Sequence, residues 1–326
     1  MNNNQLVELS AKYGSAFYLL DTAQFRKNFS ELKNAFASIY PNTNIAYSYK
    51  TNYIPALCKI VDDLGGLAEV VSDMELNIAR KRGVNPNNII WNGPYKNPQE
   101  FENLLLEGGQ VNLDSYCETE LLKTIAKNHP DRILNIGVRV NFAINDNTVS
   151  RFGFDVASKD FSETLNVISQ LDNVKLSGIQ CHYATRRLET WRPRAEKMIE
   201  LLGRIGIVPP RIDLGGGLYG KIHESLKKQF DAYIPTYQEY AENVAPLFAK
   251  KFGSMPNPPQ LLIEPGSALV GDCMSFVAKV VSIKSIRGQY FATLLGSSHN
   301  INISCKNPSG TSAVLLSPKS VTMGLI

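Results

Sequence analysis

Four short apolar runs recur at a constant interval early in the chain, and this interval limits the folds open to it. The runs begin at Ile45, Leu67, Ile89 and Val111, so each starts 22 residues after the one before. That length holds one strand, a turn, one short helix and a second turn. The interval therefore predicts repeated β–α units in this part of the chain.

Amphipathic stretches fill two of these intervals and end in helix stop signals. One covers residues 73–80 and is followed by Gly83, and the other covers 98–106 and is followed by Gly108-Gly109. A glycine just beyond the last position of a helical pattern is typical of a helix end. Both stretches are therefore predicted to be helices between successive strands.

The later apolar runs are spaced more widely. They cover 133–140, 176–181, 211–214 and 261–263. Eight apolar runs, each followed by a helix-like segment, favour an α/β fold of the (β/α)8 TIM-type barrel. A doubly wound open sheet is the alternative that the spacing alone leaves open.

The two ends of the chain differ from this pattern. Residues 16–20 predict a strand before the barrel, and 274–283 with 290–295 predict strands that no helix separates. We therefore expect three parts: an N-terminal segment packing with a β domain at 1–25, the barrel at 26–268, and a partial C-terminal β domain at 269–326.

Composition excludes several classes of function. The net charge of the 326 residues is +4 and the basic residues are scattered, so we expect no nucleic-acid partner. The five cysteines form no Cys-x-x-Cys pair, so we expect neither a disulfide framework nor a metal site. The first residues do not form a signal peptide, and no apolar run approaches the ~18 residues of a membrane span. We therefore expect a cytoplasmic protein with free thiols and no membrane contact.

The first apolar run leads into Lys50. A lysine straight after a strand is most often a solvated surface residue. In a barrel, however, the strand ends and the loops that follow them form the face that carries active sites. Lys50 is there a candidate Schiff-base lysine, and burial would lower the pKa of its amine toward the reactive neutral form.

Three other strand ends carry groups with two interpretations each. His182 after the sixth run is either a core histidine or a ring that stacks on a cofactor or transfers protons. Gly215, Gly216 and Gly217 after the seventh run form either a sharp turn or a cradle of free N–H groups for a phosphate. Glu264 after the eighth run either pairs with a neighbouring strand or faces a protonated pyridine nitrogen.

These four signals are modest singly. Together they supply an amine, a flat partner, an anion site and a carboxylate at one face of a barrel. This is the set of groups that pyridoxal 5'-phosphate (PLP) requires.

Seven sequence elements resemble, in order, those of the fold-type III PLP-dependent amino-acid decarboxylases, the family of the diaminopimelate and ornithine decarboxylases. The first is similar to that family's Ala-Val-Lys-Ala-Asn lysine motif, and the resemblance covers roughly residues 10 to 300. The elements are Tyr47-Ser48-Tyr49-Lys50-Thr51-Asn52, Glu69-Val70-Val71-Ser72 with Glu75-Leu76, Val138-Arg139-Val140-Asn141, Ser150-Arg151-Phe152-Gly153, Gly178 to Thr185, Asp213-Leu214-Gly215-Gly216-Gly217 and Glu264-Pro265-Gly266.

The resemblance implies an alanine-racemase-like barrel, a homodimer and a set of residue roles. It implies that Lys50 forms a Schiff base with PLP, that His182 stacks on the pyridine ring and that Glu264 pairs with the ring nitrogen. The implied cofactor-binding residues are Lys50, Arg139, His182, Thr185, Gly215, Gly216, Gly217, Glu264 and Gly266.

We therefore interpret the chain as a PLP-dependent decarboxylase of a basic or diamino acid. Two departures from the family are visible: Ser267 stands where the family has Arg, and 302–326 holds no counterpart of the family's Cys-x-x-x-Asp segment. The substrate and the full activity of this chain are therefore left open. The alternatives are an amino-acid racemase on the same scaffold and a non-catalytic PLP-binding or homeostasis protein.

Overall fold

The computed structural model describes residues 3–144, 146, 149–222, 227 and 233–300. Contacts divide the chain into two units. The larger consists of Thr22–Gly220 and Pro235–Val270, and the smaller of Met1–Asp21, Lys221–Ile234 and Gly271–Ile326. The strand ends singled out in the sequence therefore all belong to the larger unit.

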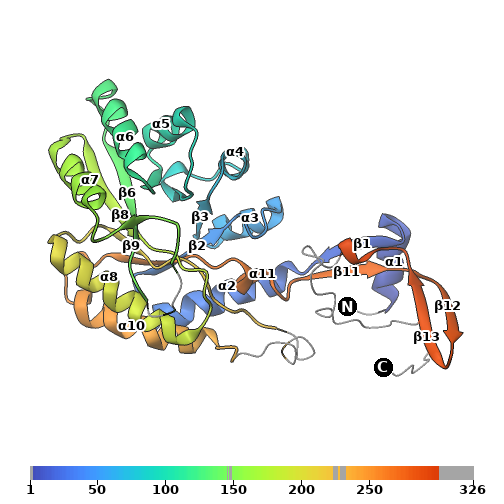
Figure 1. Ribbon diagram of the computed structural model, residues 1–326. Helices are drawn as coiled ribbons and strands as arrows, with labels where there is room; N and C mark the ends of the chain where they lie inside the picture. The colour runs from blue at the N-terminus through green and yellow to red at the C-terminus, as the bar shows by residue number, and fades with distance from the viewer. Residues whose placement is uncertain (1–2, 145, 147–148, 223–226, 228–232, 301–326) are drawn as a thin grey trace. The chain divides into compact units, whose positions relative to one another are not determined.

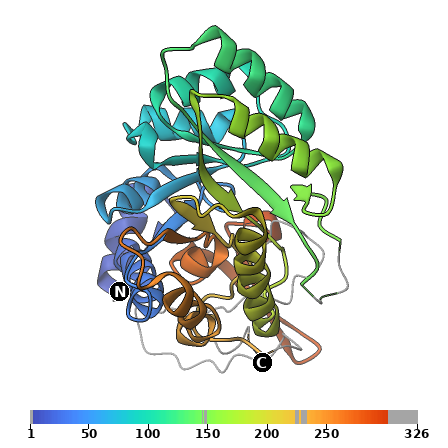
Figure 2. The ribbon, with the colours of Figure 1, turned by 90° about the vertical axis from the view of Figure 1, so that its left-hand side faces the viewer.

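Within the described residues, eight parallel strands form the wall of a closed barrel (Figures 1 and 2). The ring closes because β5 pairs with β6 and β10 pairs with β2. In order around the barrel, the strands are β2 (Thr43–Ser48), β3 (Leu67–Val70), β4 (Ile89–Trp91), β5 (Gln110–Leu113), β6 (Leu134–Asn141), β8 (Val174–Gln180), β9 (Arg211–Asp213) and β10 (Gln260–Ile263). The predicted (β/α)8 barrel is confirmed, and the open sheet is wrong. A two-residue strand, β7 (Phe154–Asp155), adds to β6.

Helices connect the strands and cover the outside of the barrel. Among them α10 packs against both α2 and α8 (Figure 1). The helical segments of this unit are α2 (Thr22–Ala37), α3 (Pro55–Asp63), α4 (Asp73–Lys81), η1 (Pro86–Asn88), α5 (Pro98–Glu107), α6 (Tyr116–Asn128), α7 (Lys159–Gln170), η2 (Leu188–Thr190), α8 (Trp191–Ile205), α10 (Tyr237–Phe252) and α11 (Ser267–Val270). The two helices predicted between early strands are confirmed as α4 and α5.

Local sequence fixes where several of these helices begin. Asn97 caps α5, accepting hydrogen bonds from the N–H groups of Gln99 and Glu100, and Pro98 stands at the first helical position, where no N–H is needed. Thr236 and Glu239 form a reciprocal capping box at the start of α10. These caps satisfy N–H groups that a helix end otherwise leaves without partners.

Strand register shows which side chains face the inside of the barrel. Because side chains alternate along a strand, residues paired across neighbouring strands share a face. Ala46 pairs with Leu67, and the cluster of Ala46, Leu67, Ile90 and Leu262 is fully buried. Each of these residues stands two positions before a polar residue at the mouth of the barrel, namely Ser48, Glu69, Asn92 and Glu264.

The smaller unit is built from antiparallel strands. In it β1 (Ala16–Leu20) pairs with β11 (Met274–Ala278), and β12 (Val280–Ile286) pairs with β13 (Gln289–Leu294). Arg287 and Gly288 connect the hairpin with φ angles of 53° and 79°, as in a two-residue turn that matches strand twist. The unit also holds α1 (Asn3–Tyr13) and η3 (Ser298–Asn300). The strands predicted at both ends of the chain are confirmed.

The predicted boundaries at 25/26 and 268/269 fall inside α2 and α11, whereas the two units meet at Asp21/Thr22 and Val270/Gly271. The partial β domain stays a prediction, and residues 302–326 with Cys305 lie outside the described residues. The four cysteines described, Cys58, Cys117, Cys181 and Cys273, carry free thiols. In the described part of the chain, no helix has the length and apolarity to cross a membrane.

Candidate active site

Lys50 lies two residues beyond β2 and contacts a carboxylate from the neighbouring strand. Its Nζ donates to Oε2 of Glu69 at 3.0 Å and to Oε1 at 3.2 Å. The Ser48 hydroxyl also donates to Glu69. The Lys50 side chain is 40% exposed while that of Glu69 is 0% exposed, so the amine is the accessible member of this pair.

The pKa of Lys50 differs from the sequence-based expectation. Burial lowers the pKa of the amine, as expected, but the carboxylates of Glu69 and Glu264 outweigh burial and raise it above its ordinary value. The net shift is therefore opposite to the expected lowering. The physical reason is that Glu69, inside an apolar run, brings a negative charge to 3.0 Å from the amine.

Glu264 follows β10 and is buried at the mouth of the barrel, with 2% of its surface exposed. Asn92 donates to its Oε1 at 2.5 Å, and Gln180 donates to both oxygens at 3.3 and 3.2 Å. Asn92 also donates to Oε1 of Glu69 at 3.1 Å. The Asn92 amide therefore joins the carboxylate beside Lys50 to that of Glu264.

The interacting carboxyl groups of Asp213 and Glu264 together carry one negative charge. Burial raises the pKa of Glu264, but the neighbouring His182, Lys50 and Arg139 outweigh it and lower the pKa to about 2. Burial, and then the charge of Glu264, raise the pKa of Asp213 well above its ordinary value. Glu264 is therefore the ionised member and Asp213 the protonated one.

His182 lies between Glu264 and the glycine turn. Its Nδ1 accepts the N–H of Gly216 at 3.1 Å and stands 3.7 Å from Oε2 of Glu264. Burial lowers the pKa of the imidazole, although Glu264 acts in the opposite direction. A neutral ring that accepts at Nδ1 carries its proton on Nε2.

The glycine turn after β9 approaches its surroundings closely. A Cβ atom at Gly216 would lie 2.4 Å from the Glu264 carbonyl oxygen, and one at Gly217 would lie 2.5 Å from that of Thr185. Gly215 and Gly217 have φ angles of 71° and 88°, which favour glycine. A side chain at either position would clash with a backbone carbonyl group of Glu264 or Thr185.

Two of the three N–H groups of this turn already have partners. That of Gly215 donates to Asp213 at 2.7 Å, and that of Gly216 donates to His182. The expectation that all three are free is therefore wrong, because Asp213 at the strand end folds back on the turn. Beneath the turn, buried Arg194 donates to the carbonyl oxygens of Leu214 at 2.9 Å and Gly216 at 2.8 Å.

The remaining predicted residues surround the same mouth. A Cβ at Gly266 would lie 2.0 Å from the hydroxyl of Thr51, the residue after Lys50. Arg139, at the end of β6, is buried; it pairs with Asp114 at 3.3 Å and stacks on Phe152. The Thr185 hydroxyl accepts the N–H of Arg187 at 3.5 Å. All nine predicted site residues thus come from the mouth-side ends of β2, β6, β8, β9 and β10.

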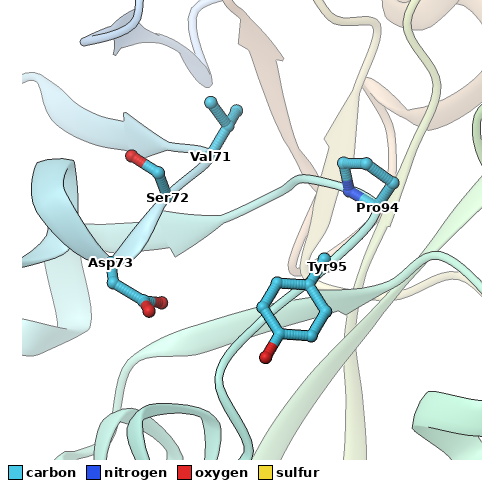
Figure 3. Close-up of a pocket in the computed structure, with 5 residues that line it drawn as sticks. All are labelled: Val71, Ser72, Asp73, Pro94 and Tyr95. Carbon is cyan, nitrogen blue, oxygen red and sulfur yellow. The ribbon is translucent and has the colours of Figure 1, made fainter.

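A pocket of about 290 Å³ opens beside the ends of β3 and β4 (Figure 3). Its walls are two short segments that begin two residues after Glu69 and Asn92. The lining residues are Val71, Ser72, Asp73, Pro94 and Tyr95. Asp73 supplies a carboxylate and Tyr95 an aromatic ring at this edge of the mouth.

Several site residues were not singled out from the sequence. Glu69, Asn92 and Gln180 make the contacts that join Lys50 to Glu264, and Arg194 holds the glycine turn. A usable signal existed for Glu69, because a carboxylate inside an apolar run needs a buried partner. No comparable signal marked Arg194, which lies in the helix α8.

The groups at this mouth fit PLP. The accessible amine of Lys50 contacts the buried carboxylate of Glu69, which Asn92 joins to that of Glu264. The pKa of Glu264 is about 2, and the neutral imidazole of His182 lies against this carboxylate. An ionised carboxylate keeps a pyridine nitrogen protonated, and a lysine amine binds an aldehyde. The glycines at 216 and 217 let the turn pack directly against the backbone of Glu264 and Thr185, beside these groups.

Comparison with protein families agrees with this geometry. Residues 22–271 match the family described as "Pyridoxal-dependent decarboxylase, pyridoxal binding domain". The match covers most of the chain and includes every residue of the predicted site. The chain belongs to this family of PLP-dependent decarboxylases, and PLP is its cofactor.

Named relatives are diaminopimelate decarboxylases. The protein of Aquifex aeolicus is 26% identical over 301 residues, covering 88% of this chain and 67% of that protein. The protein of Methanocaldococcus jannaschii is 27% identical over 302 residues, covering 85% of this chain and 66% of that protein. This chain thus spans about two thirds of the length of these relatives.

Solved structures show the same fold. The diaminopimelate decarboxylase of M. jannaschii superposes with a TM-score of 0.76 at 26% identity, covering 88% of this chain and 69% of that one. A lysine/ornithine decarboxylase from Vibrio vulnificus superposes with a TM-score of 0.69 at 17% identity, covering 89% and 74%. At 17% identity, this second similarity shows only that the fold is the same.

Proposed function

We propose that this chain decarboxylates a basic or diamino acid with PLP bound at the barrel mouth. The observation that carries the proposal is the connection of the accessible Lys50 to the buried Glu264 through buried Glu69 and Asn92, at the mouth-side ends of four strands. The relatives from Aquifex aeolicus and Methanocaldococcus jannaschii are named diaminopimelate decarboxylases, which supports a diamino acid.

The residues present would hold PLP in named ways. Lys50 would bind its aldehyde, Glu264 its ring nitrogen, and His182 would lie against its ring. The glycine turn with Thr185 and Gly266 would surround the phosphate, and Arg139 would lie beside the cofactor. When bound, PLP supplies a conjugated ring that accepts the electron pair left when the α-carboxylate departs.

The chain's own residues contribute orientation and charge. Glu264 stays ionised because its neighbours lower its pKa to about 2, so it favours a protonated ring nitrogen. Glu69 holds a proton on Nζ of Lys50 before ligand binding, because its carboxylate raises the pKa of that amine. Asn92 and Gln180 hold the Glu264 carboxylate in place. Such preorganised charges commonly supply a large share of catalysis.

The pocket beside β3 and β4 suits the far end of a basic substrate. Asp73 offers a carboxylate and Tyr95 a ring face, both attractive to an ammonium group. Ser267 provides no cation for a distal carboxylate, because serine cannot replace the bidentate contact of arginine. The pocket therefore favours a distal amine over a distal carboxylate.

The test has two parts. Borohydride treatment of the PLP-loaded protein, followed by peptide mass spectrometry, should place the pyridoxyl group on Lys50, and Lys50→Ala should remove the visible absorbance of the bound cofactor. Carbon dioxide release is then measured with lysine, ornithine, arginine and diaminopimelate. A change of optical rotation without carbon dioxide release would mean a racemase, and PLP binding without turnover would mean a carrier; either result contradicts the proposal.

The assembly and location are also proposed. We infer a homodimer in the cytoplasm, with no nucleic acid or membrane as partner. The β12–β13 hairpin supports association, because Ile283, Ile286, Tyr290 and Phe291 expose apolar surface. Four free cysteines suit a reducing compartment. Size-exclusion chromatography with light scattering tests the dimer, and a monomer at micromolar concentration would contradict it.

A further inference from the structure

A continuous chain of side-chain hydrogen bonds crosses the inside of the barrel. It starts at Arg211, where β9 begins, and ends at Glu264 at the mouth. Arg211 donates to Gln110 at 3.4 Å, Gln110 to Asn112 at 2.8 Å, Asn112 to Asn92 at 2.7 Å, and Asn92 to Glu264 at 2.5 Å. We call these three amides, Gln110, Asn112 and Asn92, the amide chain.

The direction of every hydrogen bond in the amide chain is fixed by its two ends. Arg211 can only donate, and the ionised Glu264 can only accept. Each amide between them must therefore accept on the Arg211 side and donate on the Glu264 side. The assignment does not depend on telling amide nitrogen from oxygen, because any flipped amide would place two donors or two acceptors face to face.

The barrel wall is built to leave room for the amide chain. Gly137 on β6 and Gly178 on β8 are paired across the two strands. A Cβ at Gly137 would lie 1.6 Å from Oδ1 of Asn112, and a Cβ at Gly178 would lie 2.4 Å from Nε2 of Gln110. Side chains at both positions would displace the two amides, so these glycines belong to the same feature.

We propose that Asn112 is a positioning residue for Glu264: it binds Oδ1 of Asn92 and so keeps the Asn92 N–H groups facing the carboxylates of Glu264 and Glu69. The inference rests on the proposed pairing of Glu264 with the PLP ring nitrogen. Asn112 donates to Asn92 rather than to any predicted PLP-binding residue, so it acts through Asn92.

The hydrogen bond from Asn92 acts on Glu264, an ionised group that is buried among other charged groups. Although burial raises the pKa of Glu264, His182, Lys50 and Arg139 lower it, and burial together with the charge of Glu264 in turn raises the pKa of Asp213. Hydrogen bonds to a buried charged group contribute more than neutral ones, and a buried acceptor without a donor is costly. If Asn92 turned its oxygen to Glu264, two buried acceptors would face each other and the carboxylate would move or take up a proton.

The experiment compares two probes in wild type, Asn112→Leu, Asn112→Asp and Glu264→Gln. The probes are PLP and its 1-deaza analogue, in which carbon replaces the ring nitrogen, and calorimetry measures both dissociation constants. Their ratio isolates the ring-nitrogen contact, since phosphate and aldehyde contacts are common to both. Thr164→Val is the matched control, because Thr164 on α7 is equally buried and loses one hydrogen bond, to Thr119 at 2.9 Å.

We expect Asn112→Leu to weaken PLP relative to the analogue by roughly tenfold, the size of one hydrogen bond to a charged group. Asn112→Asp should retain the wild-type ratio at low pH, where its protonated carboxyl still donates to Asn92 and accepts from Gln110. Its ratio should fall as pH rises and the new carboxyl ionises. A residue that only filled space would give no such pH dependence.

The outcomes separate this inference from the proposed function. If both Asn112 variants keep the wild-type ratio at every pH while Glu264→Gln changes it, Asn112 does not position Glu264 and the inference is overturned alone. If Glu264→Gln also leaves the ratio unchanged, Glu264 does not contact the ring nitrogen and both proposals are overturned. A shift in Thr164→Val equal to that in Asn112→Leu would assign the effect to stability and overturn the inference too.

Discussion

The two halves of the barrel lining are made of residues with different chemistry. One pleat below the mouth, β10, β2, β3 and β4 present Leu262, Ala46, Leu67 and Ile90, which pack as an apolar cluster. The strands β5, β6, β8 and β9 instead contribute Gln110, Gly137, Gly178 and Arg211, which form the amide chain or leave room for it. Burial of apolar side chains stabilises the apolar half in any close packing. The polar half is stable only when each donor meets an acceptor.

This difference shows which strands make polar contacts with the residues at the mouth of the barrel. The apolar half supports Ser48, Glu69, Asn92 and Glu264 from below but offers them no polar contact. The polar half reaches across the barrel to Asn92 and Glu264 through Asn112 and Gln180. The strands of the apolar half thus also carry Lys50, Glu69 and Glu264, whereas β5 and β8 contribute the hydrogen bonds of Asn112 and Gln180.

The largest effect is expected from crowding the polar half. Gly137→Ala would place a Cβ 1.6 Å from Oδ1 of Asn112 and force that side chain out of its hydrogen bonds. We expect a loss of about 3 kcal/mol in the free energy of unfolding, the upper part of the range for overpacking. Urea denaturation followed by circular dichroism measures it. A loss below about 0.5 kcal/mol would show that the polar half adapts as easily as an apolar core.

Glu69→Gln tests the charge at the mouth. Removing the carboxylate removes the main cause that raises the pKa of Lys50, and burial then lowers it. More of the amine is neutral at a given pH, so the pH at which PLP capture is half-maximal should move downward. Stopped-flow absorbance over a pH series measures this midpoint. An unchanged or higher midpoint would mean that Glu69 does not control the amine.

Asp213→Asn tests the protonated member of the carboxyl pair. Because the pKa of Asp213 is raised, the folded protein keeps a proton on this carboxyl group at pH values above 3.8, the ordinary pKa. The unfolded chain releases that proton in the same pH range. This difference opposes folding at neutral pH and vanishes below that value. The amide oxygen of the variant still accepts the N–H of Gly215, so that hydrogen bond is retained. We therefore expect a higher melting temperature than wild type at pH 7, with the two values converging as pH falls toward 3.8. Differential scanning calorimetry over this pH range measures both, and a lower melting temperature at pH 7 would contradict the assignment.

The smallest effect is expected from Ile90→Val in the apolar half. Ile90 is fully buried within the cluster, and one methylene is lost. We expect a loss of about 1 kcal/mol in the free energy of unfolding that is independent of pH, with PLP affinity unchanged. The same denaturation series at pH 5 and pH 8 measures it. A pH-dependent loss would show that the two halves of the lining are not independent.

Much of the barrel could be predicted from the sequence. The 22-residue interval placed the first four strands, and the later runs placed the other four. Strand-end residues also predicted that Lys50, His182 and Glu264 would meet, because parallel strands end on one face. The amide chain could not be predicted in this way. Gln110-Val111-Asn112-Leu113 alternates like a half-exposed strand, yet its polar side is buried inside the barrel.

Local patterns along the chain specify which segments are strands, where they end and which reactive groups stand at those ends. These properties depend on the alternation of apolar and polar residues, so nearby positions are enough to define them. The charge state of Lys50, the partners of Glu264 and the space that Gly137 leaves for Asn112 are set by the folded barrel instead. Each of these depends on residues from different strands, because the strength and sign of a charge interaction follow distance through space rather than along the chain.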